Sequence, residues 1–187
     1  MKWLTMTTII VFLQACSHAP EIALPRAKDV DLSRFMGDWY VIANIPTFIE
    51  KGAHNAIESY AMNEDGTIAT TFRFNQDSFE GELKQYNPTG YVSENINSEW
   101  GMQFIWPFKA EYIIAYLSND YKHTIIARSA RDYLWIMSRS PVIDEHLYQS
   151  LVQRCVDMGY QRELIKKIPQ QVRSSQNQHV VKMEAIQ

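Results

Sequence analysis

Eight short strand-like stretches follow one another through most of this 187-residue chain, joined by links of hairpin length. Apolar and polar side chains alternate within them, and turn residues such as Gly66 and Pro88 interrupt the pattern. A run of short antiparallel strands predicts an all-β domain, an eight-stranded antiparallel up-and-down barrel. Eight closed strands leave no exposed edge and enclose room for side chains or one small ligand. The stretches are residues 39–44, 55–62, 67–74, 79–92, 102–106, 112–117, 123–128 and 133–138.

The hydrophobic period changes to that of a helix after residue 138. Ser140 and Pro141 offer an N-cap and a first-turn proline, and Gly159 offers a C-terminal stop. Residues 164–168 predict a short ninth strand, and residues 170–187 a flexible polar tail. The folded domain is therefore expected over residues 31–169, with one C-terminal helix packed outside the barrel. The apolar stripe of that helix is Ile143, Leu147, Leu151, Cys155 and Met158.

The N-terminus carries an export signal. Lys2 supplies the positive start, and the apolar run over residues 4–13 is too short to span a bilayer, so residues 1–15 are interpreted as a signal peptide. Residues 13–16, Leu-Gln-Ala-Cys, resemble the lipobox of bacterial lipoproteins, which implies an acylated Cys16 that anchors the protein in the membrane and a tether over residues 16–30. Ser17, where an aspartate would signal inner-membrane retention, favours the outer membrane and a domain facing the periplasm. The alternative is a plain signal peptide with Cys16 as an incidental thiol.

Composition and missing motifs argue against several classes of function. Lysine and arginine number 18 against 21 acidic residues, and no long basic run occurs, so no nucleic-acid partner is expected. The chain contains no G-x-S-x-G, H-E-x-x-H or C-x-x-C motif and no glycine-rich phosphate loop. Its five histidines are scattered, and Cys155 falls in the apolar helical stripe, which is typical of a buried hydrophobe. We therefore expect a binding protein, not an enzyme, with no catalytic residue, metal or cofactor.

Three short motifs occur in order along these elements. Gly37 and Trp39 open the first stretch, Asp120 lies in an Asn-Asp-Tyr tripeptide before the seventh, and Arg139 follows the eighth. In this order they resemble the lipocalin family, and within it the bacterial outer-membrane lipocalins and their apolipoprotein D-like relatives. The resemblance covers residues 31–170 and implies a lipocalin barrel. It also implies that Trp39 plugs the closed end against the Arg139 guanidinium, that Asp120 fixes a tight turn, and that none of these residues touches ligand.

The same resemblance places Arg139 on the inner face, and alternation then puts Tyr133, Trp135 and Met137 there as well. The strand register that the resemblance implies assigns the inward residues of the other strands. Buried tyrosine hydroxyls need partners, which favours a cavity holding water or a ligand headgroup over a fully packed core. The expected ligand contacts are Glu58, Tyr60, Thr70, Phe72, Tyr86, Met102, Phe104, Tyr112, Ile114, Tyr116, Tyr133 and Trp135. The same face is expected to hold Ala56, Met62, Ile68, Phe74, Lys84, Trp106, Ile125, Ala127 and Met137.

A face of phenylalanine, methionine, isoleucine and tyrosine suits an aliphatic chain. Glu58 is the exception: Lys84 or a cationic headgroup would satisfy its carboxylate, unless it lies at the rim in water or the register is off by one. Clustered tyrosines beside a carboxylate favour lysophospholipid over fatty acid. The predicted function is storage or transport of such lipids for membrane maintenance. The alternatives are an envelope lipoprotein that acts only through protein partners, and a carrier of a flat ring such as haem or a bilin.

One loop is expected at the open end of the barrel. Residues 106–108, Trp-Pro-Phe, should lie there beside a lid formed by residues 46–52. Exposed aromatic side chains in this position suit entry into a bilayer or a homodimer contact. A loop folded over the cavity mouth is the third possibility.

Overall fold

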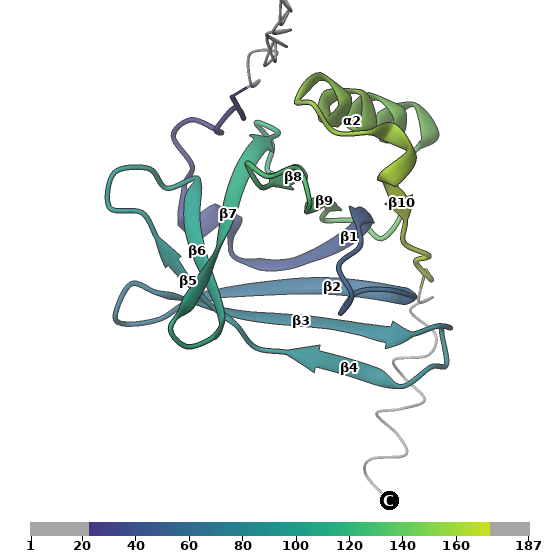
Figure 1. The fold of residues 1–187 in the computed structure, drawn as a ribbon, viewed down its shortest axis with the longest axis horizontal. Helices are drawn as coiled ribbons and strands as arrows, with labels where there is room; N and C mark the ends of the chain where they lie inside the picture. Colours follow the sequence, from purple (N-terminus) through teal and green to yellow (C-terminus); the bar gives the residue numbers. More distant parts are fainter. Residues whose placement is uncertain (1–22, 173–187) are drawn as a thin grey trace, which may run out of the picture.

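The computed structural model describes residues 23–172. In this part of the chain the strands form a closed antiparallel barrel (Figure 1). β1 pairs with β2 on one side and with β9 on the other, which closes the sheet. β4 and β5 both pair with β3 and are two halves of one bent strand, so the predicted eight-stranded barrel is confirmed. The strands are β1 (Gly37–Ile45), β2 (Ala53–Met62), β3 (Ile68–Gln76), β4 (Leu83–Tyr86), β5 (Thr89–Val92), β6 (Glu99–Ile105), β7 (Phe108–Leu117), β8 (His123–Ala127) and β9 (Leu134–Ser138).

The stretch expected over residues 79–92 is shorter and broken because of Pro88, which has no N–H to donate to a ladder. Its carbonyl instead accepts two hydrogen bonds from Thr70, from the backbone N–H at 3.2 Å and from the hydroxyl at 2.7 Å. Beyond the break, Gly90 brings β5 close to the interior: a Cβ there would lie 3.2 Å from both Ile68 and Met102. The bend therefore lets one strand follow β3 along both halves of the barrel.

α2 (Glu145–Asp157) packs outside the barrel, and a 3₁₀ turn (Arg162–Leu164) leads to β10 (Lys166–Lys167), which pairs with β1 (Figure 1). The helix begins later than predicted. Asp144 is its N-cap and accepts a hydrogen bond from the Leu147 N–H at 2.8 Å. The prediction of Ser140 as the cap is wrong, because its hydroxyl donates to the Val142 carbonyl at 2.8 Å in a separate turn. No helix within residues 23–172 is long and apolar enough to cross a membrane.

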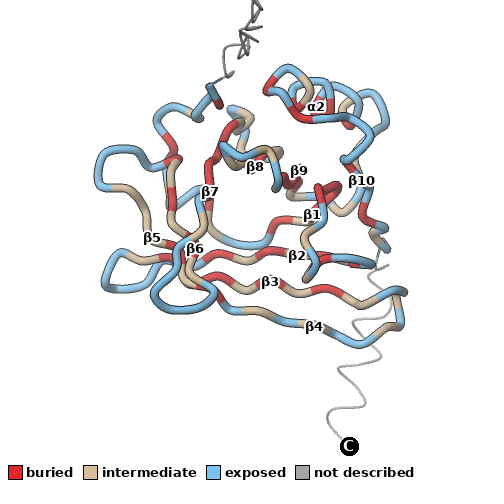
Figure 2. Tube along the Cα trace, in the orientation of Figure 1, coloured by how far each residue is buried: buried red, intermediate tan, exposed pale blue. Residues whose placement is uncertain are grey.

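Buried side chains form two clusters, one inside the barrel and one between the barrel wall and α2. Figure 2 marks the buried residues in red along the strands and α2. A β-bulge between Ile114 and Tyr116 shifts the pairing of β7 with β8 and reverses the alternation there. Tyr116 therefore packs in the cluster under α2, and Ile126 is the β8 residue inside the barrel. The inward prediction for Tyr116 is wrong for this reason. The inward predictions for Ile125 and Ala127 are wrong because the inward Ile114 pairs with Ile126, so that the residues on either side of Ile126 face α2.

Part of the expected tether is packed onto the domain. Leu24 and Val30 are both buried, one in each cluster, and the Ala27 N–H donates to the Ile114 carbonyl at 2.8 Å. The ordered contacts thus begin before residue 31. The predicted signal peptide, Cys16 and residues 173–187 lie outside the described residues.

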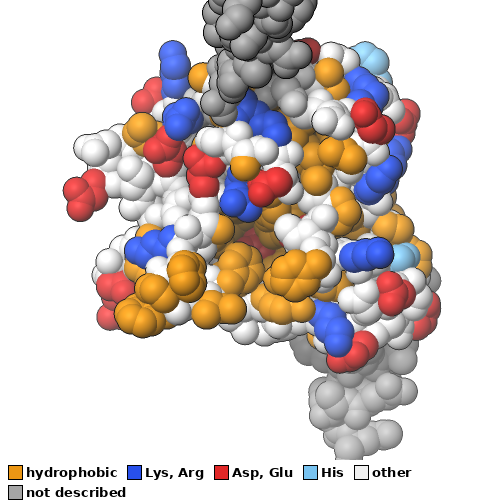
Figure 3. All heavy atoms as spheres, viewed as in Figure 1, with side chains coloured by type: hydrophobic (Ala, Val, Ile, Leu, Met, Phe, Trp, Pro, Cys, Tyr) orange, Lys and Arg blue, Asp and Glu red, His pale blue; other side chains and the backbone are white. Residues whose placement is uncertain are grey.

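Exposed apolar side chains gather at one end of the barrel, in the lower part of the face shown in Figure 3. They come from the β1–β2 loop and from the β6–β7 hairpin. The most exposed are Phe48 at 91%, Trp106 at 81%, Phe108 at 76% and Ile105 at 74%. Because the Trp106 side chain is 81% exposed, it is not packed over the interior, and the loop of residues 106–108 is not folded over the mouth.

Candidate functional site

The residues of the three motifs meet at the other, closed end of the barrel. α1 (Leu32–Phe35) leads into it, and the buried Trp39 indole donates its Nε1–H to the Phe35 carbonyl at 2.8 Å. The central carbon of the Arg139 guanidinium lies 3.7 Å from the centroid of the Trp39 ring, and an Arg139 nitrogen donates to the Asp38 carbonyl at 2.7 Å. Gly37 has a φ of +90° and would place a Cβ 3.5 Å from that guanidinium. This stacked pair seals the closed end.

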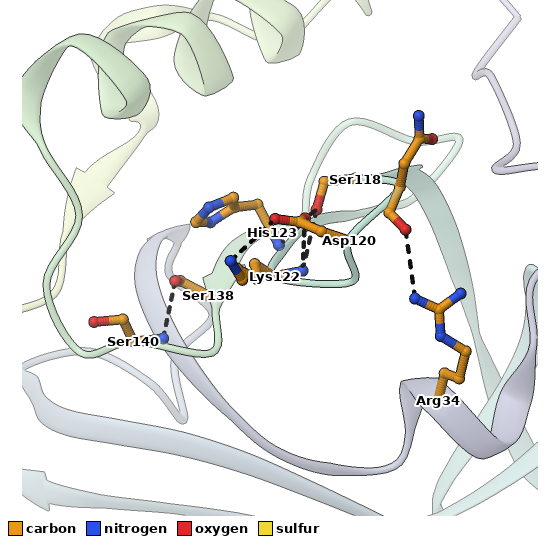
Figure 4. Close-up of polar contacts among 8 residues, drawn as sticks. Arg34, Ser118, Asp120, Lys122, His123, Ser138 and Ser140 are labelled. Carbon is orange, nitrogen blue, oxygen red and sulfur yellow. Dashed lines mark hydrogen bonds and ion pairs between the residues drawn. The ribbon is translucent and has the colours of Figure 1, made fainter.

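A hydrogen-bonded turn joins β7 to β8 beside α1 (Figure 4). The Ser118 hydroxyl and the Lys122 backbone N–H donate to the same carboxylate oxygen of Asp120, at 2.6 and 3.2 Å. The bond from Ser118 is the largest cause of the lowered pKa of Asp120. Arg34 of α1 donates to the Asn119 carbonyl at 3.5 Å, which ties the turn to the helix. Asp120 makes the kind of turn-fixing contacts that the lipocalin resemblance implies.

Aromatic rings fill the closed half of the interior. The Phe35 ring lies 5.4 Å from the Tyr60 ring and 5.6 Å from the Trp100 ring, centroid to centroid. Trp100 stacks on Tyr112 at 5.2 Å, and the hydroxyls of Tyr60 and Tyr112 hydrogen-bond to each other. The closed half is therefore a packed core, and space for a guest is confined to the open half.

The open half contains a cavity of about 140 Å³. Its lining is mostly aromatic and aliphatic. Seven of the predicted ligand contacts line it: Glu58, Phe72, Met102, Phe104, Tyr112, Tyr133 and Trp135. Seven further residues complete the wall: Thr47, Phe48, Ile49 and Glu50 from the β1–β2 loop, with Ala110, Glu111 and Arg128 from β7 and the β8–β9 link. Alternation along a strand gives no information about a loop, so it could not predict that residues of the β1–β2 loop line the cavity.

The other predicted contacts lie elsewhere. Tyr60 and Ile114 are buried in the interior core, and Tyr86 packs against that core. The Thr70 hydroxyl donates its hydrogen bond to the Pro88 carbonyl. Tyr116 lies outside the barrel wall, where Arg154 of α2 stands 4.6 Å over its ring. Of the other residues placed on the inner face, Met62 and Trp106 are exposed, and Lys84 forms an ion pair with Glu82 at 2.8 Å instead of reaching Glu58.

Two buried carboxyl groups line the cavity. Glu58 is 1% exposed, and its Oε2 has no hydrogen-bond partner among the described residues. Glu50 is also buried, and its Oε2 accepts hydrogen bonds from Asn44 Nδ2 at 2.7 Å and from Trp135 Nε1 at 3.0 Å. Burial raises the pKa of both, and the nearby charge of Glu50 raises the pKa of Glu58 further, against a smaller opposite effect of Arg73. Glu58 is therefore not a rim residue in water.

The raised pKa of Glu58 predicts how stability changes with pH. The folded protein holds the Glu58 proton more tightly than the unfolded chain, so this residue costs stability as pH rises above the ordinary glutamate value of 4.5. Glutamine keeps the shape and cannot ionise. We expect Glu58→Gln to unfold like the wild type at about pH 4 and to be more stable than the wild type at about pH 8, as measured by urea unfolding. A stability difference that is the same at both pH values would contradict this.

The comparisons with known proteins agree with this architecture. A family model described as a lipocalin-like domain matches residues 30–170. The chain belongs to the lipocalin family. Among its relatives, temperature-induced lipocalin-1 from Arabidopsis thaliana is 30% identical over 153 residues, covering 76% of this chain and 81% of that protein. The outer membrane lipoprotein Blc from Escherichia coli K12 is 26% identical, covering 82% and 87%, and Blc from Vibrio cholerae is 23% identical, covering 91% and 100%.

Solved structures show the same fold. Apocrustacyanin C1 matches this lipocalin with a TM-score of 0.62 at 12% identity, covering 87% of this chain and 99% of that one. Insecticyanin from Manduca sexta matches with a TM-score of 0.62 at 14% identity, covering 78% and 84%. At such identities the likeness concerns the fold alone.

The lipocalin family consists in general of non-enzymatic binding proteins. Within residues 23–172 no group of three or more histidine, cysteine, aspartate or glutamate side chains is placed to hold a metal. Cys155 is buried under α2, and burial raises the pKa of its thiol to about 12. A thiol held neutral in this way is a poor nucleophile.

Proposed function

We propose that this lipocalin is a non-catalytic carrier that stores or transports lipids with one hydrocarbon chain, either fatty acids or lysophospholipids. The supporting observation is the mostly apolar cavity in the open half, whose wall includes Phe72, Met102 and Trp135. Each methylene that enters contributes about 0.8 kcal/mol before ordering costs. A cavity of about 140 Å³ takes part of a slender chain and leaves the rest to the apolar rim. It is small beside the roughly 300–1,000 Å³ of most drug-sized pockets, which argues against a flat haem or bilin ring.

The exposed rim favours contact with a lipid surface. Phe48 of the β1–β2 loop both lines the cavity and is highly exposed, and Ile105, Trp106 and Phe108 of the β6–β7 hairpin are exposed as well. Aromatic residues of this kind are suited to the interface between headgroups and acyl chains. We infer that the rim meets the membrane when lipid is loaded, and a homodimer contact through the same residues is the competing possibility.

The proposed cellular location is the periplasmic face of the outer membrane. Its supports are the lipobox-like sequence that ends at Cys16 and the names of the bacterial relatives, outer membrane lipoproteins. Several acyl chains on Cys16, at about 0.8 kcal/mol per buried methylene, would hold the protein there almost permanently. A lipid carrier in this place would serve maintenance of the envelope.

A binding assay on delipidated protein tests the carrier function. We expect a fluorescent fatty-acid probe to bind with a stoichiometry of one and to be displaced by unlabelled lysophospholipid or fatty acid. No binding at any lipid concentration would favour the lipoprotein that acts only through protein partners. A coloured protein as purified would instead support a bound haem or bilin.

A further inference from the structure

The base of the cavity holds the buried carboxyl group of Glu58, one oxygen of which has no hydrogen-bond partner among residues 23–172. We propose that this base binds an ammonium group, so that an amphiphile enters headgroup first and its hydrocarbon tail lies at the mouth. The inference rests on the proposed carrier function and assigns the chemistry and orientation of its ligand. It follows from three observations: the position of Glu58, the charges around it, and the distribution of polar groups along the cavity.

Glu58 lies deep in the barrel. In the β1–β2 pairing it stands opposite Trp39, the residue that plugs the closed end, and in the β2–β3 pairing it stands opposite Phe72. It is 1% exposed and lines the cavity, and its Oε2 has no hydrogen-bond partner among residues 23–172. A buried polar atom without a partner costs roughly 1–3 kcal/mol, and more if it is charged. A methyl-ended tail placed here would leave that cost in place, whereas an N–H donor would remove it.

Arg73 is the cation whose charge acts on Glu58, and it does not line the cavity. Glu50 of the β1–β2 loop adds a second carboxyl group, and the neighbouring tyrosines carry only neutral hydroxyls: Tyr60 of β2, Tyr112 of β7 and Tyr133 before β9. Arg73 of β3 acts on Glu58 from outside, where it donates to Asp38 at 3.1 Å. The cation that best complements two buried acids would therefore come from the ligand.

Two other charged residues line the cavity, and both have partners near its mouth. Arg128 forms an ion pair with Asp132 at 3.6 Å through a terminal nitrogen, and its side chain is about a third exposed, while its buried Nε has no hydrogen-bond partner among the described residues. Glu111 accepts hydrogen bonds from the backbone N–H and the hydroxyl of Ser129, at 2.6 and 2.9 Å. Beyond them the rim is formed by Phe48 and Phe104, which are 91% and 50% exposed. Glu58 is thus at the base and the most apolar exposed surface is at the mouth, which suits a headgroup at the base.

Binding of the ammonium group is coupled to proton release. In the empty cavity burial favours the neutral acid form of Glu58, because its pKa is raised. When an ammonium group binds, the Glu58 carboxyl loses one proton to solvent and forms an ion pair with the ligand. Affinity should then rise by up to tenfold for each unit of pH until Glu58 ionises unaided. A fatty acid, which must keep its own proton beside these carboxyl groups, should show the opposite dependence.

Calorimetry on the delipidated protein tests the ammonium site. It uses three twelve-carbon probes, dodecylamine, dodecanol and dodecanoic acid, and one single-chain phospholipid, lysophosphatidylethanolamine. We expect dodecylamine to bind at least tenfold more tightly than dodecanol at about pH 8, with about one proton released and an affinity that falls towards pH 6. Glu58→Gln should lose this preference and the pH dependence and keep dodecanol binding. Glu64→Gln, the same change at an exposed turn at the closed end, should leave all four affinities unchanged. Dodecylamine and lysophosphatidylethanolamine both carry an ammonium group. The one that binds more tightly shows whether the site takes this group from a simple alkylamine or from a phospholipid headgroup.

Failure of the ammonium site and failure of the carrier function would give different binding results. Equal affinity for dodecylamine and dodecanol without a pH dependence, or a preference for dodecanoic acid, would overturn the ammonium site and leave the carrier function standing. Failure of all four probes to bind would overturn both. Orientation has its own readout, since the anomalous signal of ω-bromododecylamine in a crystal should place bromine beside Phe48 and Phe104. Bromine beside Glu58 would reverse the assignment.

Discussion

Replacing Trp39 with alanine is expected to lower the free energy of unfolding by about 4 kcal/mol and the melting temperature by about 10 °C. The indole is fully buried, donates a hydrogen bond to the Phe35 carbonyl and lies against the Arg139 guanidinium. Its removal leaves a cavity, and the cation–π contact with Arg139, worth about 0.5–2 kcal/mol, is lost as well. Domains are stable by only about 5–15 kcal/mol, so the variant should lie close to the limit of folding. Denaturant unfolding followed by circular dichroism measures the change.

Trp106→Ala is the matched control for that experiment. It removes the same side chain from a position that is 81% exposed, so its effect should stay within about 0.5 kcal/mol of zero. Equal destabilisation by the two variants would mean that Trp39 does not plug the closed end in the way its contacts indicate.

Filling the cavity should abolish lipid binding without unfolding the protein. Ala110 lines the cavity on β7, opposite Met102 of β6, and its side chain leaves space that a larger one would occupy. We expect Ala110→Trp to weaken binding of a fluorescent fatty-acid probe at least tenfold, because the indole takes the volume of about 140 Å³ that the chain needs. Overpacking costs roughly 1–3 kcal/mol, which a folded barrel tolerates. Probe titration and a thermal melt of the same sample measure both effects.

Ala69→Trp makes the same change on the outer face of β3, where the side chain is exposed. It should bind the probe as the wild type does. If Ala110→Trp also kept full affinity, the probe would be bound elsewhere, for example on the exposed rim.

Sequence patterns predicted the barrel well where each strand has one buried face. In β2 and β3 the alternation, in the register that the lipocalin resemblance implies, correctly placed Glu58 and Phe72 inside. β9 is buried on both faces, and there Trp135 was correctly placed from the inward Arg139 that the resemblance implies. In β6 it would also have found Trp100 if the strand had been extended by two residues from Met102. The order of eight strands, one helix and one short strand followed from the change of period after residue 138.

The failures have a physical cause. Residues 113–116 of β7 are Ile-Ile-Ala-Tyr, apolar throughout, because one face lines the barrel and the other lies under α2. Alternation of apolar and polar residues then carries no information about which side chains face the interior. The bulge after Ile114 turns Tyr116 to the outer face, and no residue pattern in the sequence signals it. The Glu50 carboxyl was missed for a related reason, since it comes from a loop and enters the cavity only through its bonds to Asn44 and Trp135.

The central claim is that the open half of the barrel holds one hydrocarbon chain, and native mass spectrometry of the protein purified without detergent tests it most directly. We expect a single adduct whose mass equals one fatty acid or one lysophospholipid, lost in Ala110→Trp and retained in Ala69→Trp. A protein that stays free of adduct after incubation with both lipids would contradict the claim.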